Sequence, residues 1–177
     1  FLIFLGYHGK GSILNSFTAH SYSSKLFSSV KVNGGKVSEA QLNSAVAKQL
    51  GVKVIFISGT KEGVEECKIP GLFSVVTKNS ISWDKASSFN REEVLEKMKD
   101  GISQAIKNSN SIGEIDISTA NPVFEIEFNY GFLIEDLGEE IVGSKTIKFS
   151  APTISDGYKK LMNLFLKAKE KYNKIYG

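Results

Sequence analysis

The amino-acid sequence predicts an α/β protein: a partly parallel sheet flanked by helices, with a smaller C-terminal α+β unit. Two observations lead to this fold class. Over residues 1–112, apolar runs of strand length alternate with helical patterns, which is typical of a parallel sheet covered by helices. From about Ile115 the pattern changes to short alternating strands and one long amphipathic helix. We therefore expect an α/β core over residues 1–112 and a C-terminal α+β unit over residues 113–177 that packs on it.

The elements of the core follow from local patterns in chain order. The continuous apolar run Phe1–Leu5 predicts a strand that is buried on both faces. Ser38 and Gln41 have the spacing of a capping box, which begins a helix, and Gly51 supplies the left-handed residue that ends it. A short helix is expected over residues 61–67. The other predicted strands of the core are residues 25–33, 52–58 and 72–78.

The later elements are predicted in the same way. Asn90 can cap a helix over Arg91–Lys107. Polar and apolar residues alternate over Phe124–Asn129, which predicts a half-exposed strand, and residues 146–149 form a similar one. A final amphipathic helix begins at Ser155. In the helix over Arg91–Lys107, the face predicted to be buried contains Val94, Met98, Ile102 and Ile106.

The composition is that of an ordinary globular protein, and it argues against two classes of partner. The chain has 22 basic and 19 acidic residues, and Arg91 is its only arginine. Nucleic-acid recognition relies on arginine and on a strongly basic surface, so we expect no nucleic-acid partner. No apolar run approaches the roughly 20 residues of a membrane helix, so we expect no membrane association. Because Cys67 is the only cysteine, no intrachain disulfide can form, and we expect a cytoplasmic protein.

Three residues are candidates for metal chemistry: His8, His20 and Glu39. His8 follows a predicted core strand in a glycine-rich turn, at the kind of strand end where functional groups of α/β sheets gather. His20 lies in a polar stretch and Glu39 in the first turn of a helix. Imidazole and carboxylate groups are zinc ligands. A structural explanation is also open for each of them, since a histidine after a strand can simply hydrogen-bond within its loop, and the helix dipole favours an acidic residue at a helix start.

Three motifs, in order along the chain, resemble the DppA-type D-aminopeptidases, a family of zinc peptidases. Phe4–His8 is similar to the family's strand that ends in Gly-Tyr-His, where the histidine is a zinc ligand. His20–Ser21 is similar to the motif that contains the family's catalytic histidine. Glu39–Asn43 is similar to the start of the helix that carries a glutamate zinc ligand. The resemblance therefore implies two metal ligands and one catalytic residue, namely His8 and Glu39 for zinc and His20 for catalysis.

The resemblance extends over most of the chain and implies an activity. Members of the family release N-terminal D-amino acids from short peptides or amino-acid amides, use a pair of zinc ions, and assemble into ring-shaped homo-oligomers. The chain is similar to roughly the C-terminal two-thirds of such an enzyme, so we expect the family's Asp-x-Glu-Gly motif and a further histidine ligand to lie upstream of Phe1. We expect the activity to depend on these upstream ligands, which the present residues do not supply. Thr60 stands where the family usually has aspartate. Two alternatives stay open: a catalytically inactive binding protein on the same fold, or a hydrolase of a related small amide.

Overall fold

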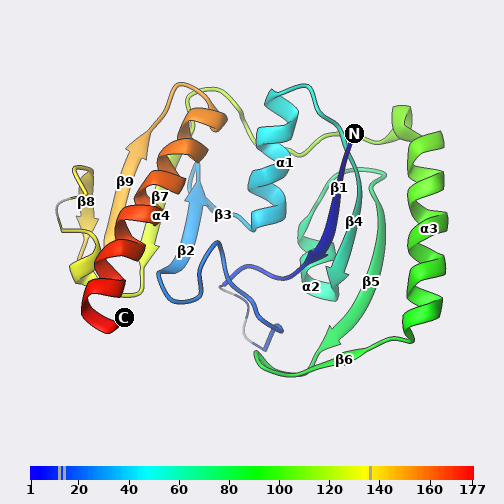
Figure 1. The fold of residues 1–177 in the computed structure, drawn as a ribbon. Coiled ribbons are helices and arrows are strands. Elements are labelled where there is room, and N and C mark those ends of the chain that lie inside the picture. Colours follow the sequence, from blue (N-terminus) through cyan, green and yellow to red (C-terminus); the bar gives the residue numbers. More distant parts are fainter. Residues whose placement is uncertain (12, 14, 136) are drawn as a thin grey trace.

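Two sheets lie side by side in the computed structural model, which describes residues 1–11, 13, 15–135 and 137–177 (Figure 1). Sheet A has the strand order β1-β4-β5-β6, in which the first three strands are parallel and the last is antiparallel. Its strands are β1 (Leu2–Tyr7), β4 (Val54–Thr60), β5 (Phe73–Ser80) and β6 (Ala86–Ser88). The partly parallel sheet expected from the sequence is confirmed.

Sheet B is antiparallel and has the order β3-β2-β7-β9-β8. Its strands come from two separate stretches of the chain: β2 (Phe27–Val32) and β3 (Gly35–Lys36), then β7 (Val123–Phe128), β8 (Glu140–Gly143) and β9 (Thr146–Ser150). The chain therefore leaves sheet A after β1, builds one edge of sheet B, and returns to sheet A. Pairing of β2 with β7 joins residues from both of the units expected from the sequence.

Within the described part of the chain, four α-helices cover the two sheets (Figure 1). The helices α2 and α3 pack against strands of sheet A, whereas α4 lies over sheet B and α1 lies between the two sheets. Their bounds are α1 (Glu39–Gln49), α2 (Lys61–Glu66), α3 (Arg91–Lys107) and α4 (Ile154–Tyr176), with short 3-10 turns at Ser109–Ser111 and Gly131–Leu133. None of the helices in the described ranges combines the length and the apolar character that a membrane crossing requires.

The expected capping box is present at the start of α1. The backbone N–H of Gln41 donates to Ser38 Oγ at 3.2 Å, and the backbone N–H of Ser38 donates to Gln41 Oε1 at 2.9 Å. These reciprocal bonds satisfy amide groups that a helix start would otherwise leave without partners. Gly51 follows the helix with φ of 69°, which is a conformation that glycine adopts without strain. The sequence thus located both ends of α1 correctly.

Burial of β1 on both faces was a wrong prediction. This strand lies at the edge of sheet A, and Leu5 is 60% exposed although Phe4 is buried. The strand that is buried throughout is β4, in the interior of the sheet. Both segments are apolar, and composition alone does not distinguish an edge strand from a central one because that difference depends on strand order.

The buried face of α3 was also partly wrong. Ile106 is 51% exposed, and the neighbouring Ala105 is fully buried. A spacing of four residues advances by about 400° around a helix, so each step moves the side chain about 40° from the previous one. Three steps from Val94 to Ile106 therefore add up to about 120°, which takes the last residue off the buried face.

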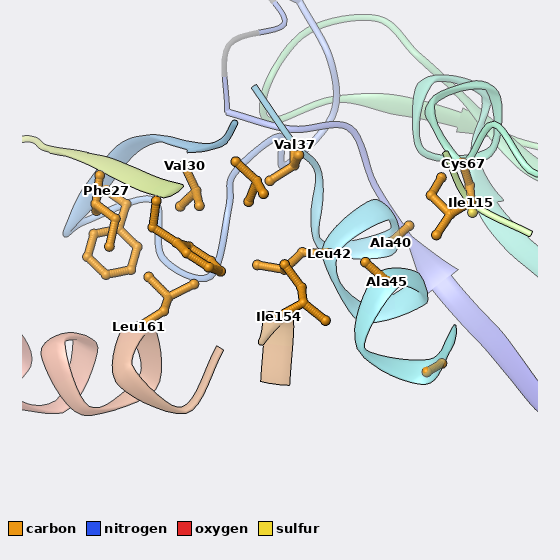
Figure 2. Close-up of a cluster of buried hydrophobic side chains, with 14 of the residues drawn as sticks. Phe27, Val30, Val37, Ala40, Leu42, Ala45, Cys67, Ile115, Ile154 and Leu161 are labelled. Carbon is orange, nitrogen blue, oxygen red and sulfur yellow. The ribbon is translucent and has the colours of Figure 1, made fainter. Parts of the chain in front are cut away.

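A continuous apolar core links the two sheets through α1 (Figure 2). Leu42 on α1 and Ile154 at the start of α4 lie at its centre and are fully buried. Phe27 and Leu161 extend the core toward sheet B, and Ile115 lies on the side of sheet A. Helix α1 is thus held from both sides, which fixes the position of its first residue, Glu39.

Candidate metal centre

The three candidate residues come together at one end of sheet A. His8 directly follows β1, His20 lies in the loop between β1 and β2, and Glu39 is the first residue of α1. Each offers a ligand atom, and these atoms all lie within 4.8 Å of one another. The imidazole rings of His8 and His20 are stacked, with centroids 4.1 Å apart. Residues that are far apart in the sequence therefore form one cluster.

Both histidines are oriented by hydrogen bonds within their own loop. His8 Nδ1 lies 3.0 Å from the carbonyl oxygen of Gly9, and His20 Nδ1 lies 2.6 Å from the carbonyl oxygen of Thr18. A carbonyl oxygen can only accept, so the proton of each neutral ring is on Nδ1. The lone pair is then on Nε2, and both Nε2 atoms face Glu39 Oε1, at 3.9 Å from His8 and 3.7 Å from His20.

Glu39 is held by a backbone contact and by its place in the helix. Its Oε1 accepts a hydrogen bond from the backbone N–H of Tyr22 at 2.8 Å. The start of α1 also favours a carboxylate, because the unpaired amides of a helix N-terminus carry partial positive charge. The structural explanation for Glu39 and the metal-ligand explanation are therefore compatible, since a helix start can fix a carboxylate that also serves as a ligand.

Strained backbone surrounds His20. Thr18 has φ of 50° and Tyr22 has φ of 64°. For a β-branched or bulky residue this left-handed conformation is unusual, and it costs about 1–3 kcal/mol per residue. Strain of this kind persists where the surrounding structure enforces it, and it is concentrated at functional sites.

Side chains of β5, of α2 and of the turn after β5 anchor the loop that carries His20. Glu62 Oε2 accepts from the hydroxyl of Ser80 at 2.7 Å, and Ser80 Oγ accepts from the backbone N–H of Phe17 at 2.9 Å. The indole Nε1–H of Trp83 donates to the carbonyl oxygen of Ala19 at 3.2 Å. These contacts hold the backbone of the loop at Phe17 and Ala19, just before His20.

Two glycines allow the backbone around His8 to pack closely. A Cβ atom at Gly63 would lie 2.8 Å from backbone atoms of His8, and one at Gly59 would lie 1.8 Å from the carbonyl oxygen of Tyr7. Any other residue at either position would have to displace the end of β1. His8 is therefore fixed by the tight packing of α2 and β4 as well as by its own hydrogen bond.

Tyrosines connect Glu39 to the interior. The hydroxyl of Tyr22 donates to Asn43 Oδ1 at 3.2 Å, and Asn43 Nδ2 donates to the hydroxyl of Tyr7 at 3.0 Å. Burial raises the pKa of Tyr22 well above its ordinary value, and the nearby charge of Glu39 adds to the effect. Burial also raises the pKa of Tyr7 and of Tyr158. These hydroxyls thus stay protonated at neutral pH and act as neutral hydrogen-bonding groups.

The chemistry and spacing of the cluster suit zinc. Imidazole nitrogens and a carboxylate oxygen are the donors of catalytic zinc sites, which combine three protein ligands with an open position. Donors about 2.0–2.2 Å from a tetrahedral ion lie about 3.3–3.6 Å from each other. The separations from Glu39 Oε1, 3.9 Å to His8 and 3.7 Å to His20, need only a small contraction. An Nδ1–H bonded to a carbonyl is a frequent way of fixing a metal-binding imidazole.

The sequence pointed to the three residues of the cluster, with His8 and Glu39 as zinc ligands and His20 as the catalytic residue, but it missed the residues that hold them. Ser80 on β5 and Trp83 in the turn after β5 contact a loop more than sixty positions earlier, and Glu62 on α2 supports Ser80. Nothing in the local sequence of these residues indicates such contacts. A lone tryptophan in a polar turn was the one feature that could have been noticed.

The fold and the cluster define a class: α/β proteins with a candidate metal centre at the carboxyl end of a parallel sheet. Residues 1–162 match the family model described as D-aminopeptidase. The chain belongs to this D-aminopeptidase family. No curated protein matches the sequence.

The fold is similar to that of a solved structure, the Zn-dependent D-aminopeptidase DppA from Bacillus subtilis, described as a self-compartmentalizing protease. The TM-score is 0.86 at 24% sequence identity, and the match covers 94% of the present chain. It covers 62% of the Bacillus chain. The present chain thus spans less than two-thirds of the length of that relative.

Proposed function

We propose that the protein is a zinc-dependent aminopeptidase that releases N-terminal D-amino acids from short peptides or amides. In this proposal His8 and Glu39 are zinc ligands and His20 is the catalytic residue. The observation that supports it most directly is that the Nε2 atoms of both histidines face one carboxylate oxygen while their Nδ1 atoms are bonded to carbonyl groups. Membership of the D-aminopeptidase family agrees with this assignment.

Each residue of the proposed site has a distinct part in the reaction. Zinc would act as a Lewis acid that polarises the scissile carbonyl. His20 can exchange a proton with substrate only through Nε2, because its Nδ1–H is bonded to the carbonyl of Thr18. Nε2 can therefore act as a general base or as a nucleophile. The strained residues on both sides of His20 support its orientation.

A two-zinc centre and a ring-shaped homo-oligomer belong to the same proposal. Paired metal ions about 3.5–4 Å apart need more donors than His8, His20 and Glu39 provide, so a second zinc ion requires ligands beyond this cluster. The description of the Bacillus protein as self-compartmentalizing supports an assembly that encloses its sites. Light scattering on the purified protein would measure the number of subunits. A cytoplasmic location stays a prediction based on the single free cysteine.

Metal analysis tests the proposed ligands. We expect zinc to bind the purified wild-type protein and to bind His8→Ala and Glu39→Gln at least about tenfold more weakly, as measured by elemental analysis after dialysis against a zinc buffer. The matched control is Glu96→Gln, which removes an exposed carboxylate on α3 and should bind zinc as the wild type does. A wild-type protein that takes up no zinc would contradict the proposal and favour an inactive binding protein.

Activity measurements test the role of His20 and the substrate class. We expect His20→Ala to keep most of its zinc and to lose hydrolysis of D-alanine amide. Loss of zinc together with activity would instead assign His20 as a third ligand. L-Alanine amide is the matched control for stereochemistry. Equal turnover of the two amides would favour a hydrolase of a related small amide over a D-aminopeptidase.

A further inference from the structure

A pocket of about 470 Å³ opens beside His20. It lies between the loop that carries His20, the start of β2, and the turn between β5 and β6. Its size is within the range of sites that bind small molecules. His20 forms part of the wall, and its Nε2 faces the proposed zinc ligand Glu39, so a molecule in this pocket would contact the proposed catalytic residue.

Among the described residues, the wall of the pocket combines an aromatic ring with neutral polar groups and the imidazole of His20. Trp83 contributes aromatic surface, and Ser24, Ser28 and Asn129 contribute neutral polar groups. Among the described residues that line the pocket there is no aspartate, glutamate, lysine or arginine. A charged group that enters such a pocket loses water without gaining an opposite charge, which is unfavourable.

Trp83 is held in place to form one side of this pocket. Its indole Nε1–H is bonded to the carbonyl of Ala19, and its own carbonyl accepts from the backbone N–H of Thr18 at 2.8 Å. The side chain nevertheless remains exposed, with 53% of the residue's surface accessible. An exposed indole that is fixed to the loop of His20 offers a rigid apolar surface at little cost in conformational entropy.

We propose that this pocket binds the side chain of the amino acid that is released, and that Trp83 makes the site selective for uncharged, apolar side chains. This inference rests on the proposed aminopeptidase function. In a substrate amide the side chain is one carbon away from the scissile carbonyl, so a carbonyl next to His20 places that side chain at the mouth of the pocket. The substrate class is therefore D-amino-acid amides and peptides with a neutral N-terminal side chain.

A pair of substrates that differ only in charge tests the selectivity. D-Norleucine amide and D-lysine amide have side chains with the same four-carbon chain, and the second carries an additional ammonium group. We expect kcat/KM to be about 10- to 100-fold higher for D-norleucine amide. Equal values for the two substrates would overturn the inference.

A change of charge in the wall tests whether this pocket is responsible. Ser24 is exposed at the pocket, so Ser24→Asp should raise the ratio of kcat/KM for D-lysine amide to that for D-norleucine amide about 5- to 10-fold. Ser118→Asp introduces the same charge at an exposed position outside the pocket and should leave the ratio unchanged. Trp83→Ala should lower kcat/KM for D-norleucine amide more than for D-alanine amide. Trp83→Phe should keep most of the wild-type preference for D-norleucine amide over D-alanine amide. An unchanged ratio in Ser24→Asp would refute the assignment.

Binding can be followed separately from catalysis, because Trp83 is the only tryptophan in the chain. D-Norleucine should change the fluorescence of the wild-type protein at a lower concentration than D-lysine does. If this selective change occurs but no amide is hydrolysed, the aminopeptidase proposal fails and the pocket assignment stands. If amides are hydrolysed without a fluorescence change or charge selectivity, the aminopeptidase proposal stands and the pocket assignment fails.

Discussion

At the scale of single residues, the position of His8 depends on the absence of a side chain at the neighbouring Gly63. Gly63 has no side chain, and the backbone of His8 occupies the space that a Cβ at this position would need. In a helix, replacing glycine with alanine normally stabilises by about 1 kcal/mol. Here the added Cβ would meet backbone at 2.8 Å, and overpacking of this kind costs about 1–3 kcal/mol. We therefore expect the steric cost to exceed the gain in helix propensity, so that the substitution of Gly63 with alanine destabilises the protein.

Gly63→Ala should consequently lower the free energy of unfolding and weaken zinc binding about tenfold, because His8 moves away from Glu39. Urea unfolding and zinc titration measure the two effects. Gly143→Ala is the control, since a Cβ there meets only the side chain of Thr146 at 3.6 Å, an ordinary contact. If Gly63→Ala is as stable as the wild type and binds zinc equally well, then close packing does not fix His8.

Cys67 provides a prediction about pH. Burial raises the pKa of its thiol above the ordinary value of 9.0, although the hydrogen bond between this thiol and Ser44 opposes the shift. When the folded pKa is the higher one, the associated stability is fully present below the unfolded pKa and is lost as the pH rises through the folded pKa. The urea midpoint should therefore fall above about pH 9 more steeply in the wild type than in Cys67→Ala. Parallel curves for the two proteins would contradict this.

At the scale of elements, the first turn of α1 serves both the fold and the candidate site. Ser38 caps the helix whose first residue is Glu39. Thr153 caps α4 in the same manner, by accepting from the backbone N–H of Asp156. Substituting each cap in turn can therefore separate a loss of helix stability from a direct effect on the cluster of His8, His20 and Glu39.

Ser38→Ala and Thr153→Ala should each lower the free energy of unfolding by about 0.5–2 kcal/mol. Only Ser38→Ala should also weaken zinc binding, because fraying of the first turn of α1 releases Glu39. Thermal unfolding and zinc titration of both variants provide the check. An equal effect of the two substitutions on zinc affinity would mean that the cap acts only through overall stability.

The sequence predicted the bounds of individual helices better than it predicted which strands pair and which elements pack together. The helix α3 has the bounds that were expected, and both ends of α1 were located, because capping and helix ends are local chemistry. The short strands β3, β6 and β8 were missed, since strands of this length form only where a partner strand is present. The candidate donors could be named from motifs, but their mutual distances depend on strand order and on the packing of α1, which no local pattern contains.

At the scale of the whole molecule, the shared core makes the two sheets interdependent. Ile154 lies at the start of α4, next to α1 (Figure 2), and the backbone N–H of Ser155 donates to Gln49 Oε1 at 2.9 Å. Ile154→Ala should therefore destabilise both sheets together, by about 2–5 kcal/mol. Unfolding followed by Trp83 fluorescence and by far-ultraviolet circular dichroism should give coincident transitions. Two separate transitions would instead support independent units over residues 1–112 and 113–177.

The path of the chain through the two sheets also affects how the protein emerges from the ribosome. Strand β2 pairs with β7, and Lys31 contacts Glu125, 94 positions later. At synthesis rates of about 5–20 residues per second, β2 waits about 5–19 s for that partner, while the apolar side chains of Phe27, Val30 and Val32 have no sheet to cover them. Nascent chains that stop before Val123 should therefore be strongly prone to aggregation and to chaperone capture, whereas chains that extend past Ser150 should escape both.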